Sequence, residues 1–180
     1  ATFLALAKAR GEAMSAKNGQ TDAGTMMAVK ADYNTVAEHL KSLDGVKIAN
    51  VNSDSQIIIG GSQSAIQQAG ISLKNKGLRV VELAVSAAFH TELVAHAQQP
   101  FAAFIDQQQF QQPNLPVFAN STAKAYPNDT NSIKEQLKNH ILNPVYFKQQ
   151  IENIHAEGGR IFVEFGPKSI LSNLVKKILK

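Results

Sequence analysis

The chain has 180 residues, 44% of them hydrophobic and 18% charged, which fits one globular domain or a domain with a small subdomain. No apolar run approaches the roughly 18 residues of a membrane helix, and the lack of cysteine excludes disulfides, thiolate metal sites and cysteine nucleophiles. We expect a cytoplasmic protein without a signal peptide, because Lys8 and Arg10 follow the apolar start and no small-residue cleavage site does. The net charge of +4 favours acidic partners, although a mildly basic surface without a special partner would carry the same charge.

The first predicted element is a helix over residues 1–15, in which apolar side chains recur near one face: Phe3, Leu4, Ala7 and Met14. No capping residue or turn precedes this helix, so we expect that part of the same domain lies upstream of the chain. Residues 17–24 have the composition of a loop.

Residues 25–85 then predict a compact βαββαβ unit. Asp32 is placed to cap its first helix, and Gly77 to end its second. The predicted order is strand 25–30, helix 33–43, strands 46–51 and 56–60, helix 64–75 and strand 78–85. This order is typical of a ferredoxin-like subdomain.

The remainder of the chain predicts an α/β body. A helix is expected over residues 91–110 with a kink or a break at Pro100, and buried strands are expected over 116–121 and 160–165. Gly166-Pro167 turns the second strand into a last helix, a connection typical of α/β architecture. The helices expected in this part cover residues 133–142, 145–157 and 169–180.

Three side chains could carry chemistry, and each has a simpler interpretation. His90 stands where a strand passes into a helix, a usual place for reactive groups, but it could also be a cap or a surface residue. Arg10 interrupts an apolar helix and could bind a carboxylate or lie on a solvated face. His140, shortly before Asn143-Pro144, could simply be a histidine at a helix C-terminus, where the helix dipole favours it.

Several common sites are excluded by spacing. The five histidines show no metal-binding spacing, and no glycine-rich dinucleotide or phosphate loop is present. A G-x-S-x-G nucleophile elbow is also missing, since the nearest string, residues 60–64, lacks the closing glycine. We therefore predict no metal site and no nucleophile within the chain.

Seven strings, in this order, resemble one family: the malonyl-CoA:acyl-carrier-protein transacylases and the acyltransferase domains of polyketide synthases, in the style of polyunsaturated-fatty-acid synthases. The resemblance implies a partial α/β-hydrolase-like acyltransferase body with an inserted ferredoxin-like subdomain. Residues 1–22 and 88–180 would belong to the body and residues 23–87 to the insert. The strings are ARGEAM (9–14), MMAV (26–29), ANVNSDSQIIIGG (49–61), AAFH (87–90), PVFANST (116–122), HILNPVYF (140–147) and VEFGPKSIL (163–171).

The resemblance also implies roles for single residues. His90 matches the family's catalytic histidine, and Arg10 matches the arginine that pairs with the malonyl carboxylate. His140 and Asn143 lie in the segment whose backbone orients that histidine. Ala88 and Phe89 would select the acyl group, with Phe89 excluding a methyl branch by about 1–3 kcal/mol.

The implied reaction is ping-pong transfer of malonyl from coenzyme A, through a seryl ester, to the phosphopantetheine thiol of an acyl carrier protein. The family's serine elbow and oxyanion-hole glutamine precede the arginine helix, so this chain alone would be inactive. No cofactor would be bound permanently. The partners would be the carrier protein, neighbouring synthase domains and the upstream part of the domain, with no nucleic acid and no membrane. Basic residues could steer the acidic substrates: Lys168, Lys176, Lys177 and Lys180.

Two departures and two alternatives accompany the resemblance. Ser86 stands where many relatives carry histidine or tyrosine, and Lys168 where glycine is frequent. A degenerate acyltransferase-like docking domain would also lack the nucleophile. A ferredoxin-like binding module for RNA is the weaker alternative, because strands 46–51 and 56–60 carry no aromatic residue for base stacking.

Overall fold

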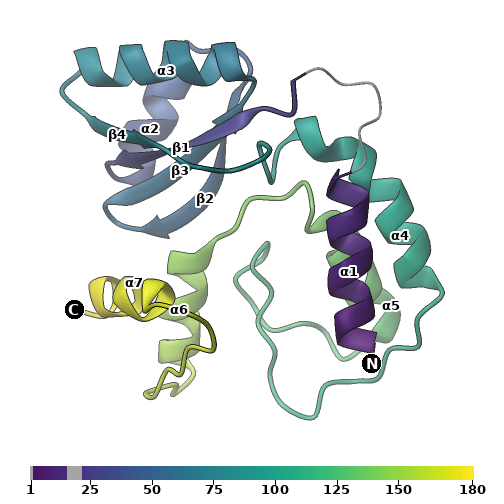
Figure 1. Cartoon of the computed structure of the whole chain (residues 1–180). Coiled ribbons are helices and arrows are strands. Elements are labelled where there is room, and N and C mark those ends of the chain that lie inside the picture. Colours follow the sequence, from purple (N-terminus) through teal and green to yellow (C-terminus); the bar gives the residue numbers. More distant parts are fainter. Residues whose placement is uncertain (1, 16–21) are drawn as a thin grey trace.

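The computed structural model describes residues 2–15 and 22–180. Figure 1 shows the βαββαβ unit at one end of the molecule, with α1 (Thr2–Ser15), α4 (Gln98–Asp106) and α5 (Thr130–Asn139) grouped beside it. Helices α6 (Phe147–Ala156) and α7 (Ile170–Ile178) lie together on the remaining side. The predicted loop over residues 17–24 falls mostly outside the described residues. None of the described helices is long and apolar enough to cross a membrane.

The βαββαβ unit is built around a four-stranded antiparallel sheet in the order β2-β3-β1-β4. Its strands are β1 (Thr25–Lys30), β2 (Val46–Ser53), β3 (Gln56–Gly61) and β4 (Arg79–Glu82). Helices α2 (Tyr33–Leu40) and α3 (Gln63–Asn75) connect them, so all six predicted elements are present.

The capping geometry confirms the predicted start of α2 and the predicted end of α3, whereas α2 ends at Leu40, three residues before its predicted end. Asp32 accepts hydrogen bonds from the backbone N–H and the hydroxyl of Thr35, which satisfies a free donor at the start of α2. Gly77 follows α3 with φ of +78°, a left-handed conformation that glycine adopts without steric cost.

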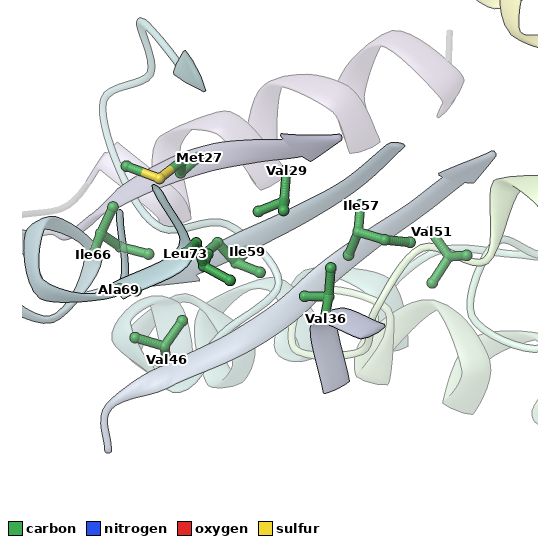
Figure 2. Close-up of a cluster of buried hydrophobic side chains, with 10 residues drawn as sticks. All are labelled: Met27, Val29, Val36, Val46, Val51, Ile57, Ile59, Ile66, Ala69 and Leu73. Atoms are coloured by element: carbon green, nitrogen blue, oxygen red, sulfur yellow. The ribbon is translucent and has the colours of Figure 1, made fainter. Parts of the chain in front are cut away.

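One face of the sheet packs against α2 and α3 and forms the main core of the molecule (Figure 2). Because side chains alternate along a strand, Met27 and Val29 enter this core while Met26 and Ala28 point to the opposite face. The core residues are Met27, Val29, Val36, Val46, Val51, Ile57, Ile59, Ile66, Ala69 and Leu73.

The helix expected over residues 91–110 is two helices. A 3-10 helix, η1 (Glu92–Ala97), precedes α4, and the non-helical backbone lies at Val94 (φ −103°, ψ 15°). The predicted interruption of the helix is therefore present, but it lies at Val94 and not at Pro100. Pro100 falls in the first turn of α4, where its missing N–H has no helical partner to lose.

Helix α6 begins two residues later than expected because Val145 pairs with the edge of β2 instead. The Val145 N–H donates to the Ala49 carbonyl, and the Val51 N–H donates to the Val145 carbonyl, both at 2.8 Å. This parallel bridge attaches the segment before α6 to the βαββαβ unit.

The two buried strands predicted after residue 88 are not formed. Within 116–121 only an isolated bridge, Phe118 to Ala125, is present among the described residues. Segment 160–165 pairs with no described strand, and Ile161, Val163 and Phe165 are 88%, 70% and 95% exposed. A strand requires a neighbouring strand to bond its N–H and C=O groups, and the described residues offer these segments none.

Candidate active site

His90 lies between β4 and η1 in a constrained loop. Its φ of +62° is a left-handed conformation that costs a non-glycine residue roughly 1–2 kcal/mol. The Ala88 N–H donates to the Ala23 carbonyl at 2.9 Å, and the Thr91 hydroxyl donates to the Ala88 carbonyl at 2.7 Å. These bonds hold the loop from both sides of His90, and backbone strain maintained in this way is typical of functional sites.

A close packing contact fixes the base of this loop. Gly24, with φ of +77°, lies against both Gly61 of β3 and Ala88 of the His90 loop. A Cβ atom at Gly24 would be 2.6 Å from the Gly61 carbonyl oxygen and 2.7 Å from the Ala88 Cβ. Only glycine fits this position without displacing the His90 loop from the sheet.

The His90 ring is oriented by backbone carbonyls. Its Nδ1 lies 2.9 Å from the carbonyl oxygen of Asn143 and 3.3 Å from that of His140. Carbonyl oxygens only accept hydrogen bonds, so Nδ1 carries the proton in the neutral ring and Nε2 presents its lone pair. This is the tautomer that a general base needs.

The surroundings keep His90 neutral near pH 7. Burial, and then the positive charge of Arg10, lower the pKa of His90, while the two carbonyl contacts act in the opposite direction. The neutral imidazole is the form that can accept a proton.

Arg10 projects from α1 into the same cavity as His90. It is half-buried, and burial lowers the pKa of its guanidinium, which nevertheless remains charged. None of the ion pairs among residues 2–15 and 22–180 involves Arg10. A half-buried guanidinium without a carboxylate partner is suited to an anionic ligand.

His140 caps the C-terminus of α5 and contacts His90 through its ring, with the two centroids 5.5 Å apart. Burial, the charge on His90 and the charge on Arg10 lower the pKa of His140 to about 4. Its Nε2 is buried and has no hydrogen-bond partner among the described residues. Its side chain is therefore neutral near pH 7, and the group of His140 within hydrogen-bonding distance of His90 is its carbonyl oxygen.

A cavity of about 650 Å³ between α1, α7 and the face of the sheet that α2 and α3 leave free is lined by Arg10 and His90, but not by His140 or Asn143. Phe89 lines it and packs against a small cluster that includes Met26 and Ile58. Ala88 is fully buried beneath the loop and does not line the cavity, so any effect on acyl selection would be indirect.

Sequence reasoning missed the amide side chain of Asn173 on α7 in this cavity, and three on the hairpin: Asn50 and Asn52 of β2 and Gln56 of β3. The latter three interrupt the apolar alternation of a hairpin whose other face is core, and this pattern could have marked a polar wall. Of the four lysines expected to steer substrates, only Lys177 lines the cavity. Residues 2–15 and 22–180 hold no group of three or more His, Asp or Glu that could bind a metal.

Comparisons with known proteins agree with this arrangement. The profile of the acyl transferase domain matches residues 3–180. A polyunsaturated fatty acid synthase protein of Thraustochytrium sp. is 39% identical over 137 residues, which are 75% of this chain and 5% of that protein. The malonyl CoA-acyl carrier protein transacylase of Staphylococcus aureus is 32% identical over 179 residues, covering 96% of this chain and 58% of that protein.

A solved structure shows the same fold. Malonyl CoA-acyl carrier protein transacylase from Clostridium perfringens matches with a TM-score of 0.90 and 33% identity, over 97% of this chain and 56% of that one. The chain thus spans less than two thirds of each of these relatives. The match over nearly the whole chain and the identities of its relatives establish that the chain belongs to the acyl transferase domain family.

Proposed function

We propose that this chain is part of a malonyl-CoA:acyl-carrier-protein acyltransferase, in which His90 is the general base and Arg10 binds the malonyl carboxylate. The observation that carries the proposal is the pairing of His90 Nδ1 with the carbonyls of Asn143 and His140. This pairing directs Nε2 away from the carbonyls as a free base, on a cavity that Arg10 also lines. Relatives that carry the name malonyl CoA-acyl carrier protein transacylase support this choice of substrate.

The nucleophile is proposed to be a serine supplied by sequence upstream of the chain. None of the described residues that line the cavity is serine, threonine or cysteine. His90 would remove the proton of the serine hydroxyl as it attacks the malonyl thioester, and would return this proton to the leaving coenzyme A thiolate. In the second half-reaction the phosphopantetheine thiol of a carrier protein would attack the seryl ester by the same proton transfers.

Arg10 would make the reaction selective for a free carboxylate. Its planar guanidinium can donate two parallel hydrogen bonds to a malonyl group, which an acetyl group cannot accept. Phe89 would limit the space beside the acyl chain, since its ring already fills part of the cavity wall. His140 and Asn143 would act through their backbone carbonyls, as positioning residues for His90.

We also propose the division of the domain: a ferredoxin-like subdomain over residues 23–87, and a hydrolase-like body to which residues 1–22 and 88–180 belong. Exposed Ile161, Val163 and Phe165 alternate with less exposed residues, as in a strand with one face uncovered, and the backbone of this segment pairs with no described strand, which leaves it free to pair with another segment. In this proposal, upstream sequence provides that neighbour and covers the apolar side chains.

The test uses this chain expressed with the sequence that flanks it in its natural protein. Incubation with malonyl-CoA, followed by intact mass measurement, should show a single malonyl adduct that acetyl-CoA forms poorly. The His90→Ala variant should form this adduct at least 100-fold more slowly, since removal of a general base typically costs 10²–10⁴ in rate.

His39→Ala is the matched control, because His39 lies on α2, across the sheet from the cavity. It should acylate like the unaltered protein. No adduct from a folded protein would reject the catalytic proposal and favour an acyltransferase-like docking domain. Equal slowing in both histidine variants would reject the role of His90.

A further inference from the structure

Helix α7 forms one wall of the cavity at His90. Four of its residues line the cavity, and they recur at the spacing of a single helix face: Ile170, Asn173, Leu174 and Lys177. Because the four side chains share one face, a rotation or a shift of α7 displaces them together. The shape of this wall therefore depends on what holds the helix in place.

The packing of α7 against the rest of the molecule is limited. Within residues 170–178 only Leu174 is buried, while Ile170 and Leu171 are 59% and 47% exposed. The residue before the helix, Ser169, makes no side-chain capping bond with the described residues. The first N–H groups of a helix have no acceptor within it, so α7 requires an acceptor from another part of the chain.

Glu164 supplies this acceptor. Its Oε1 accepts a hydrogen bond from the Leu171 N–H at 3.1 Å. Its Oε2 accepts from the Ser172 N–H at 2.9 Å and from the Ser172 hydroxyl at 2.7 Å. These bonds, first those from Ser172, lower the pKa of Glu164, so the carboxylate is ionised near pH 7. A negative charge at a helix N-terminus also interacts favourably with the helix dipole.

The chain reverses between Glu164 and α7, and the bonds of Glu164 span this turn. Lys168 in the turn has φ of +71°, a left-handed conformation that is unfavourable for a non-glycine residue. Such strain persists only where the surrounding structure holds it. Glu164 is less exposed than its neighbours Val163 and Phe165, so it lies on the opposite side of the segment from the apolar side chains that upstream sequence is proposed to cover.

We infer that Glu164 is a positioning residue of the active site, which fixes the first turn of α7 and thereby keeps the cavity-lining face of this helix in place. Glu164 itself is absent from the described lining of the cavity, so it acts only through α7. The inference rests on the proposed acyl transfer, since it takes the cavity at His90 as the binding site of malonyl-CoA. Without the cap, a smaller fraction of the molecules has the wall in the competent position, and the apparent affinity falls in proportion to that fraction.

The first test measures binding without turnover, so that it remains informative if the catalytic proposal fails. Malonyl-CoA is titrated calorimetrically into the flanked chain used above, in its His90→Ala form. Adding Glu164→Ala should weaken binding roughly three- to tenfold. Unchanged binding would overturn the inference, as would the absence of binding to the His90→Ala chain itself.

Two milder variants grade the effect. Glu164→Gln keeps an amide oxygen that can still accept from the N–H groups of α7, so it should restore part of the affinity lost in Glu164→Ala. Ser172→Ala removes only the hydroxyl bond and should weaken binding less than Glu164→Ala does. A Glu164→Gln variant as weak as Glu164→Ala, with Ser172→Ala unaltered, would overturn the capping role.

Asp32→Ala is the matched control, because it removes a similar carboxylate cap from α2, across the sheet from the cavity. Asp32 accepts from the N–H and the hydroxyl of Thr35, as Glu164 does from those of Ser172. Both variants should lower the melting temperature by about 2–4 °C, but only Glu164→Ala should weaken binding. Equal weakening in the two variants would show a general loss of stability and overturn the inference.

Acylation rates separate positioning from chemistry. In the flanked chain with His90 intact, Glu164→Ala should raise the malonyl-CoA concentration that gives half-maximal adduct formation, by about the factor seen in binding, and leave the maximal rate nearly unchanged. A lower maximal rate at an unchanged half-maximal concentration would overturn the inference. If the unaltered chain binds malonyl-CoA but forms no adduct, the proposed function fails, and the binding test alone decides the role of Glu164.

Hydrogen exchange reports on the helix itself. The backbone amides of residues 173–177, which include three of the cavity-lining residues, should exchange faster in Glu164→Ala than in the unaltered chain, because α7 opens more often without its cap. Asp32→Ala should leave their exchange unaltered. Equal exchange of these amides in Glu164→Ala and the unaltered chain would show that the cap does not hold the wall, and would overturn the inference.

Discussion

The βαββαβ unit and the helical remainder of the chain bury their apolar side chains to different extents. The unit closes its own core, in which Val29, Ile57 and Ile59 are fully buried. The remainder leaves Ile161 and Phe165 in solvent, although their pattern is that of a buried strand. The comparison shows that the unit buries the apolar side chains of its strands by itself, while the remainder leaves an apolar segment exposed to solvent.

The candidate site lies where these two regions meet. The ring of His90 comes from the loop after β4, while the carbonyls that orient it come from the segment between α5 and α6. The bridge between Val145 and β2 sets the distance between them. The βαββαβ unit thus anchors the segment between α5 and α6, whose carbonyls orient His90.

The largest difference between the regions should appear in stability. Ile59→Ala removes a fully buried side chain from the main core and should lower the free energy of unfolding by about 2–5 kcal/mol. Urea denaturation followed by circular dichroism measures the effect. A loss below about 1 kcal/mol would show that this core is not what stabilises the chain.

A functional test of the helical remainder concerns Arg10 on α1. Arg10→Gln should remove the charge-assisted contact with the malonyl carboxylate, worth about 1.5–3 kcal/mol. The preference for malonyl-CoA over acetyl-CoA should then fall roughly 10- to 100-fold in rates of acyl-adduct formation, with acetyl transfer nearly unchanged. Lys8→Gln, on the exposed face of α1, is the control and should keep the preference. An unaltered preference in Arg10→Gln would assign carboxylate recognition to another group.

The site should also contribute to the pH dependence of stability. The pKa of His140 is about 4 in the folded chain, against an ordinary value of 6.5, so the unfolded chain binds more protons between these values. The contribution of neutral His140 to the free energy of unfolding should therefore be complete above pH 6.5 and should be lost as the pH falls towards 4. In His140→Gln this slope, measured by urea titrations across the window, should be smaller by up to about one proton. An identical slope in the variant would contradict the burial of a neutral His140.

The smallest effect is expected at the exposed strand-like segment. Phe165→Ala should change the free energy of unfolding of the 180-residue chain by no more than about 0.5 kcal/mol, because Phe165 is 95% exposed. The urea measurement is then repeated on the chain with its natural flanking sequence. If that sequence covers the Phe165 ring, Phe165→Ala should lower the free energy of unfolding by more than it does in the 180-residue chain. A large loss in the 180-residue chain itself would mean that the segment already has a partner.

The sequence predicted the βαββαβ unit well because its signals are local. Caps such as Asp32, the turn at Gly77 and the alternation along β1 depend on residues only a few positions apart. It failed at residues 116–121 and 160–165 for a related reason. Their apolar pattern indicates strands, but strand formation depends on a neighbouring strand that no local pattern supplies.

Within the candidate site, the sequence by itself determined the residue types and their order: a histidine after the last strand of the unit, an arginine in the first helix and a polar segment around Asn143. Only the tertiary structure decided which groups meet. It placed two carbonyls on the Nδ1 of His90 and lined one cavity with Arg10 and His90. The physical reason is that these groups come from residues 50 to 80 positions apart, so their meeting follows from how the elements pack rather than from the preference of any one segment.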